Sequence, residues 1–213
     1  MFSLRSHVLA PMAALAIGTV FGALAPLLEA SDGMGHVAHV VLAAGWTWAA
    51  LAFCVGLARK SRVESAALAA VSLTSAVIAY YATKFKQGEF QVANLADPSG
   101  AAQVSWDSFL SKTIAWCVVA LFLGPLLGLA GNLARADGLR GLPFRVLVPV
   151  VTLVETTQRL RFEASLQGTV ARATWTVVLV AAGVLLIGLV GHAVLARRPR
   201  ASAERAPSLE GRR

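Results

Sequence analysis

Apolar residues along the chain gather into long uninterrupted blocks and do not alternate with polar ones. Five blocks are long enough to cross a bilayer, since a membrane-spanning helix needs roughly 20 mainly apolar residues. Their interiors contain no Asp, Glu, Lys or Arg, and a helix satisfies its own backbone polar groups in lipid. The pattern therefore predicts spanning helices at residues 8–30, 37–58, 65–82, 113–133 and 173–196.

A sixth block, residues 142–160, is ambiguous because its apolar run is short and Arg145 and Glu155 flank it closely. With six crossings and a cytoplasmic N-terminus, 13 of the 19 lysines and arginines lie on the cytoplasmic side, in agreement with the positive-inside rule. With five crossings, the arginines that follow residue 196 would face outward. The charges therefore predict an all-α bundle of six spanning helices, residues 1–196 forming one domain and both termini lying in the cytoplasm.

The composition supports the membrane prediction and argues against a nucleic-acid-binding protein. The chain is 57% hydrophobic and 14% charged, with a mean hydropathy of +0.68, whereas a soluble domain has about 25% charged residues. The net charge of +8 is distributed between the apolar blocks and in the tail, with no basic groove carrying aromatic stacking partners, so nucleic-acid binding is not expected. The basic tail, residues 197–213, has almost nothing to bury and is predicted to be disordered.

Two of the predicted helices carry small residues at four-residue spacing. The helix at 8–30 has Gly18 and Gly22, and the helix at 113–133 has Gly124 and Gly128. Such stripes let helix backbones approach closely in lipid. Two interpretations remain open: packing within the bundle, or a docking face for another membrane protein or a second copy of the chain.

The candidate site is centred on a carboxylate in the short block. Glu155 and Arg159 are four residues apart and can pair on one helix face, with Gln158 beside them. A carboxylate near membrane depth normally faces a cavity or a partner charge. The pattern is therefore typical either of a polar pocket for a small solute or of an ion pair that anchors a short helix. Lys84, at the outer end of the third helix, is a candidate partner for Glu155 or Glu89.

The sequence contains no recognisable motif for metal binding, disulfide formation or nucleotide binding. His36 and His39 share a helix face, but the sequence supplies no obvious third ligand, so no metal is expected. Cys54 and Cys117 are predicted to lie in opposite leaflets, too far apart for a disulfide. No nucleotide, phosphate-binding or nucleophile motif has its required context, and no cofactor is predicted.

The segments Tyr80-Tyr81-Ala82-Thr83-Lys84 and Gly124–Arg135, together with the proline-containing segment that ends at Glu155, resemble a family of small multi-pass membrane proteins of high-GC, actinobacterial species. The resemblance implies a bacterial inner-membrane location and brings no activity with it. The six-helix size and the small-residue first helix are also similar to the substrate-binding subunits of vitamin transporters, at the level of fold alone.

Taken together, these patterns favour a non-enzymatic membrane protein that binds a small solute or lipid, or serves as an accessory transport subunit. An intramembrane enzyme that uses Glu155, Lys84 or the histidines as acid or base is the alternative from another class. A purely structural or assembly role is the third. The bilayer is the expected surrounding in every case, with a membrane-protein partner or a homo-oligomer as further options.

Overall fold

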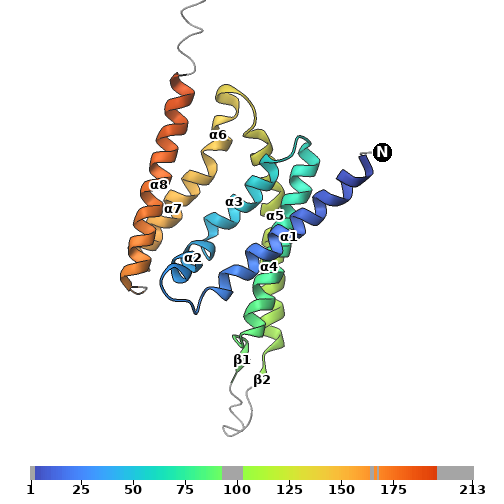
Figure 1. Cartoon of the computed structure of the whole chain (residues 1–213), viewed down its shortest axis with the longest axis vertical. Coiled ribbons are helices and arrows are strands. Elements are labelled where there is room, and N and C mark those ends of the chain that lie inside the picture. Colours follow the sequence, from blue (N-terminus) through green and yellow to red (C-terminus); the bar gives the residue numbers. More distant parts are fainter. Residues whose placement is uncertain (1–2, 93–102, 164–165, 167, 196–213) are drawn as a thin grey trace, which may run out of the picture.

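The computed structural model describes residues 3–92, 103–163, 166 and 168–195, and these residues form an almost entirely helical protein (Figure 1). A pair of two-residue antiparallel strands joins α4 to α5 and was not expected from the sequence. In chain order the elements are α1 Ser3–Leu27, α2 Met34–Leu42, α3 Gly45–Leu57, α4 Arg62–Lys86, β1 Gln91–Val92, β2 Gln103–Val104, α5 Trp106–Leu133, the 3-10 turn η1 Gly138–Arg140, α6 Leu142–Arg145, α7 Leu147–Phe162 and α8 Gly168–Leu195.

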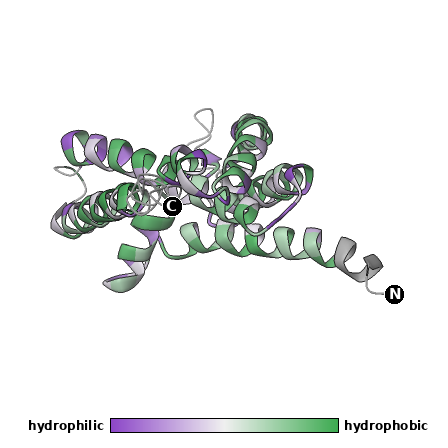
Figure 2. Cartoon of the chain, turned by 90° about the horizontal axis from the view of Figure 1, so that it is seen from above, coloured by the Kyte–Doolittle hydropathy of each residue, from purple (hydrophilic) through white to green (hydrophobic). Residues whose placement is uncertain are grey.

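Four helices of the described part are long and apolar enough to cross a membrane: α1 through its segment Leu9–Leu27, and α4, α5 and α8. The pair α2 and α3 adds a fifth crossing if the two count as one bent span. The all-α class is thus confirmed, and four to five helices of the described part could cross a membrane. Apolar residues dominate most helices when the molecule is viewed from above (Figure 2). The predicted tail, residues 197–213, lies outside the described residues.

The prediction of one continuous helix at residues 37–58 is wrong. The backbone breaks at Ala43 and Ala44, and α2 and α3 meet at an angle of 70°. Ala44 adopts an extended conformation (φ −76°, ψ 141°), although neither proline nor a charged residue marks the site in the sequence. Hydropathy does not report such a break, because both halves are equally apolar.

The helices form two groups that α3 connects. In the first group α4 packs against α1, α5 and α3, and α3 also packs against α5. In the second, α7 lies along α8, and α2 contacts α8. Figure 1 shows α7 and α8 on the left and α4 and α5 on the right, with α3 between them. The contacts of α3 with α7 and of α1 with α2 join the two groups.

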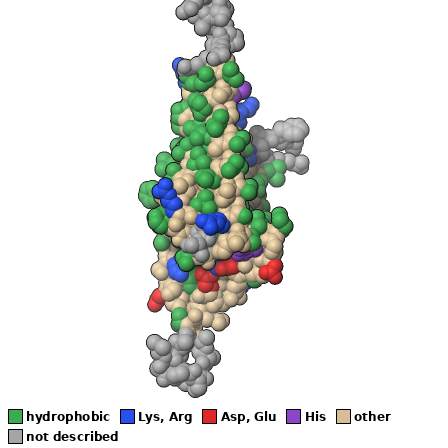
Figure 3. Space-filling view, turned by 90° about the vertical axis from the view of Figure 1, so that its left-hand side faces the viewer, with side chains coloured by type: hydrophobic (Ala, Val, Ile, Leu, Met, Phe, Trp, Pro, Cys, Tyr) green, Lys and Arg blue, Asp and Glu red, His purple; other side chains and the backbone are tan. Residues whose placement is uncertain are grey.

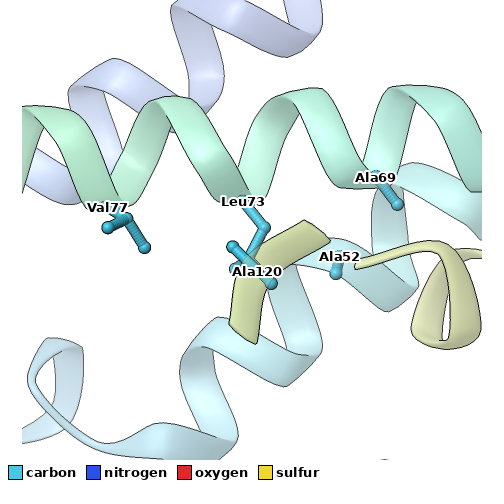
Figure 4. Packing of buried hydrophobic residues seen from close by; sticks show 5 residues of the cluster. All are labelled: Ala52, Ala69, Leu73, Val77 and Ala120. Carbon is cyan, nitrogen blue, oxygen red and sulfur yellow. The ribbon is translucent and has the colours of Figure 1, made fainter. Parts of the chain in front are cut away.

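The core of the first group is built from small side chains. Ala52, Ala69, Leu73, Val77 and Ala120 form one buried cluster where α3, α4 and α5 meet (Figure 4). Because alanine projects so little from the helix, the backbones approach closely and gain dispersion contacts where no hydrophobic drive exists between helices.

The predicted glycine stripes lie in these close contacts. A Cβ added at Gly18 would clash with the Ser72 carbonyl oxygen, and one at Gly22 with the Ala76 carbonyl oxygen, both on α4. On α5, Gly124 lies against Ala70 and Gly128 against Ser65, both also on α4. All four glycines are buried. The stripes therefore pack α1 and α5 onto α4 within the chain, which leaves these glycines inaccessible to a docking partner.

Candidate functional site

The break between α2 and α3 exposes backbone groups that side chains then satisfy. The Trp48 indole Nε1 donates a hydrogen bond to the Leu42 carbonyl (3.0 Å), and the Thr47 hydroxyl donates to the Ala44 carbonyl (2.6 Å). Unpaired backbone groups cost several kcal/mol in lipid. Trp48 and Thr47 therefore allow a break that the apolar surroundings would otherwise forbid.

The free amides at the start of α3 are held by a carboxylate from a distant helix. Glu155 of α7 accepts hydrogen bonds from the backbone N–H of Gly45 (2.8 Å) and of Trp46 (2.7 Å). A helix N-terminus carries a partial positive charge, so a carboxylate there is favourable in both charge and geometry. Glu155 is thus the N-terminal cap of α3, supplied from 110 residues further along the chain.

Arg159 extends this contact into a charge network. Its Nε donates to Glu155 (3.0 Å), and its Nη1 donates to Glu163 (2.8 Å), so one guanidinium bridges two carboxylates. The guanidinium also lies over the ring of Trp175 on α8, 5.0 Å from its centroid. The side chains of Glu155 and Arg159 are 21% and 24% exposed. The network therefore ties α3, α7 and α8 together at one level.

A cavity of about 530 Å³ adjoins this network, a size within the range of known ligand sites. Glu155 and Arg159 form its polar end, and apolar or aromatic side chains of α3, α4 and α5 form the rest. The lining residues are Ala43, Gly45, Trp48, Ala49, Leu73, Val77, Tyr80, Tyr81, Trp116, Val119, Ala120, Leu123, Leu127, Glu155 and Arg159.

Aromatic rings shape the wall on the α3 and α4 side. Trp48 makes edge-to-face contacts with Tyr80 (centroids 5.8 Å apart) and with Phe21 of α1 (5.5 Å), and Tyr80 contacts Tyr81 (5.3 Å). Such contacts hold the rings in defined orientations. This wall is therefore largely pre-formed.

The opposite side of the cavity reaches the molecular surface. Trp116, Val119 and Leu123 line it on α5 and are 52%, 39% and 46% exposed. All three belong to a helix apolar enough to span the membrane. The cavity therefore opens sideways, along the face of a helix that could span a membrane.

Lys84 belongs to a separate ion-pair cluster. Its ammonium group pairs with Glu29, in the turn that follows α1 (2.7 Å), and with Glu89. Of the two predicted partners, Glu89 is therefore the one observed and Glu155 is not. Gln87 adds a hydrogen bond to the Pro26 carbonyl (2.8 Å). Lys84 is buried among these contacts, whereas the two carboxylates are about half exposed. The cluster fastens α4 to the end of α1 and does not line the cavity.

Gln158 and the histidine pair, also singled out from the sequence, do not belong to the cavity. Gln158 is exposed and does not line the cavity. The rings of His36 and His39 stack with centroids 6.3 Å apart, and His39 bonds to the Ala25 carbonyl (2.7 Å). No group of three or more His, Cys, Asp or Glu within the described ranges is placed to hold a metal ion. Gln158, Lys84 and the histidines thus lie outside the candidate site.

Sequence reasoning located Glu155 and Arg159 but missed their partners. Gly45, Trp46 and Trp48 all come after the helix break, and the break has no sequence signal of its own. Trp48 could have been singled out as an indole placed within an apolar block, because its N–H needs an acceptor when buried. That acceptor is the carbonyl which the break releases.

Comparison of the chain with protein-family models, with curated proteins and with solved structures found no match. The candidate site therefore rests on its own geometry.

Proposed function

We propose that this protein is a non-enzymatic multi-pass membrane protein that binds a small, largely apolar molecule entering its cavity from the bilayer. The observation that carries the proposal is the cavity itself, with its aromatic wall, its sideways opening and a polar end formed by Glu155 and Arg159. Concave, mostly apolar sites with a few convergent polar groups are the usual form of small-molecule sites.

The ion pairs at the polar end of the cavity indicate what kind of polar group a ligand should carry there. Glu155 already accepts from two backbone amides and from Arg159, which in turn bonds to Glu163. Since Glu155 and Arg159, the two charges that line the cavity, pair with each other, the site suits a molecule whose polar end forms hydrogen bonds without carrying a full charge. The same contacts favour binding over acid–base catalysis, since neither Glu155 nor Lys84 is free of ion-pair partners.

The proposed topology is six crossings with both termini in the cytoplasm of a bacterial inner membrane. Besides the four long helices and the bent pair, α6 and α7 together cover residues 142–162, and α7 packs along α8. Basic residues predominate at the end of the bundle where α3 joins α4 and α5 joins α6, hereafter the basic end, and the positive-inside rule assigns that end to the cytoplasm. The charged residues of these two connections and their flanks are Arg59, Lys60, Arg62, Glu64, Arg135, Asp137, Arg140 and Arg145.

Native mass spectrometry of the protein, extracted gently from its own membrane, tests the binding function. We expect a retained small molecule in the native protein and its loss in Ala49→Phe, since Ala49 lines the cavity and a phenyl ring would occupy that space. The matched control is Ala115→Phe, an equal enlargement at an exposed position of α5 outside the cavity lining.

Equal retention in Ala49→Phe and Ala115→Phe would place the molecule elsewhere and overturn the cavity assignment. A bare native protein that also takes up no lipid-soluble compound from a lipid extract would reject the binding function. A reporter fused after Arg213 tests the topology independently, and an extracytoplasmic signal there would contradict six crossings.

A further inference from the structure

A second cavity, about 220 Å³ in volume, lies toward the basic end between α1 and α3, over α4. It is lined mainly by small and apolar side chains, including Ala13 and Ile17 of α1, Val55 of α3 and Leu68 of α4, and Arg59 brings a charge to this lining. We call it the Arg59 groove. The described lining residues of the two cavities do not overlap, so a ligand in the Arg59 groove is independent of the function proposed for the first cavity.

Arg59 is fixed at the end of this groove by the bundle. The buried Asn132 side chain of α5 donates hydrogen bonds to the carbonyl oxygens of Arg59 (2.8 Å) and Lys60 (3.2 Å) and to the Ser65 hydroxyl (3.1 Å). The Arg59 amide also donates to the Gly56 carbonyl (3.1 Å). The backbone from which the guanidinium extends is therefore held in place before any ligand arrives.

The guanidinium of Arg59 has no ion-pair or hydrogen-bond partner among the described residues. Two other arginines of the basic end are occupied, since Arg135 donates to the Leu57 carbonyl (3.1 Å) and Arg145 to the Ala134 carbonyl (2.7 Å). A half-buried cation beside apolar surface is unfavourable without a counter-charge. Arg59 is thus available to an anion at the edge of the groove.

We propose that the Arg59 groove binds one anionic phospholipid, with an acyl chain lying along the apolar lining and the phosphate held by Arg59. A guanidinium presents parallel N–H groups that match two phosphate oxygens. The neighbouring Lys60 and Arg62 contribute long-range attraction to anionic headgroups.

The proposal is tested on the full chain in vesicles of phosphatidylcholine that contain about 20% phosphatidylglycerol, enough to give the surface the negative potential that attracts basic segments, ejected directly into a native mass spectrometer. We expect one retained phosphatidylglycerol on the native protein. Arg59→Gln should lower its retention about tenfold, because it removes the charged hydrogen-bond donors. Arg59→Lys should restore part of the retention.

Two further variants separate a built site from general attraction. Arg62→Gln removes the same charge from an exposed neighbour that does not line the groove and should change retention less than about twofold, as expected for a single exposed charge. Ala13→Phe leaves Arg59 intact but fills the groove, and should lower retention as strongly as Arg59→Gln. Because Ala13 lies on α1 and Arg59 in the connection between α3 and α4, loss of folding in one variant leaves the other informative.

Equal losses in Arg59→Gln and Arg62→Gln would show attraction by charge alone and overturn the proposal. Equal retention of phosphatidylcholine and phosphatidylglycerol would reject the role of Arg59. Absence of any retained phosphatidylglycerol on the native protein would reject the site.

Discussion

The contact of α1 with α4 and the contact of α3 with α7 join helices by opposite means. In the first, Gly18 and Gly22 bring two backbones together with almost no side chain between them. In the second, a charged side chain of α7 reaches the open N-terminus of α3. A larger side chain would disrupt the first contact, and removal of the hydrogen-bond acceptor would disrupt the second. Two solutions to helix association thus occur in one small protein.

The two contacts also differ in how much space they leave between the helices that they join. Close glycine packing excludes space, and the α1–α4 surface near Gly22 is filled by the Ala76 backbone. The polar contact holds α7 at the length of a glutamate side chain, and the larger cavity lies beside it. A polar contact is therefore the one suited to building a binding site, because it joins helices without closing the space between them.

The largest expected effect is at the glycine contact. Gly22→Leu should lower the free energy of unfolding by about 3 kcal/mol or more, since the new side chain meets α4 backbone that cannot move aside. The measurement is the thermal unfolding of purified protein in detergent, followed by tryptophan emission. The control is Gly183→Leu on α8, where an added Cβ meets nothing within 4 Å. Equal destabilisation by the two substitutions would refute close packing as the cause.

The polar contact should give the next largest effect. Glu155→Ala removes the acceptor of two amides and of Arg159, and we expect a loss of about 2–3 kcal/mol. Glu163→Gln, at the second and more exposed carboxylate that Arg159 contacts, should cost about 0.5 kcal/mol or less. Both are measured by the same thermal unfolding. A Glu155→Ala protein as stable as the native one would show that the cap contributes nothing to stability.

Lys84 tests whether an ion-pair cluster adds to a contact that glycines already hold. Lys84→Met leaves Glu29 and Glu89 without their shared cation, and because both carboxylates are about half exposed, water screens the loss to about 1 kcal/mol. Lys86→Met, an exposed neighbour on the same helix, is the control. If Lys84→Met destabilised the protein more than Gly22→Leu, the ion pair and not the glycine contact would hold α1 on α4.

The smallest effect is expected at the meeting point of α3 and α7. A Cβ added at Gly45 lies 3.1 Å from Glu155 Oε2, so Gly45→Ala should shift the carboxylate slightly. Because Gly45 is the first residue of α3, alanine gains at most the ~0.8–1 kcal/mol of helix propensity that applies in a helix interior. The two effects nearly cancel in the native background. In Glu155→Ala only the gain remains, so the same substitution should stabilise that variant. A double-mutant cycle of unfolding free energies measures the difference, and a coupling energy of zero would show that the added methyl group does not disturb Glu155.

The surface of the molecule also separates hydrophobic from acidic side chains. Viewed from the α8 side, hydrophobic side chains cover much of the upper molecule, acidic side chains gather in its lower part, and Lys and Arg side chains appear at several heights (Figure 3).

Much of the fold could be predicted from the sequence, and the site only in part. The long blocks correspond to α1, α4, α5 and α8, with ends that differ by several residues; α5, for example, begins at Trp106 and not at 113. The pairing of Glu155 with Arg159 is expected from four-residue spacing alone. The capping of α3 by Glu155 and the pairing of Lys84 with Glu29 join residues 110 and 55 positions apart, for which local spacing offers no guide.

The sequence by itself determined that this protein is helical and suited to lipid, because block length and the absence of charge within blocks depend only on neighbouring residues. It also placed the glycines, whose size is a property of each residue alone. The tertiary structure decided where the helix of residues 37–58 breaks and which carboxylate caps the break. It also left Arg59 without a side-chain partner among the described residues. Those outcomes depend on which helix lies beside which, and an apolar surface packs against any other apolar surface with little preference, so the hydrophobic pattern does not specify the neighbour.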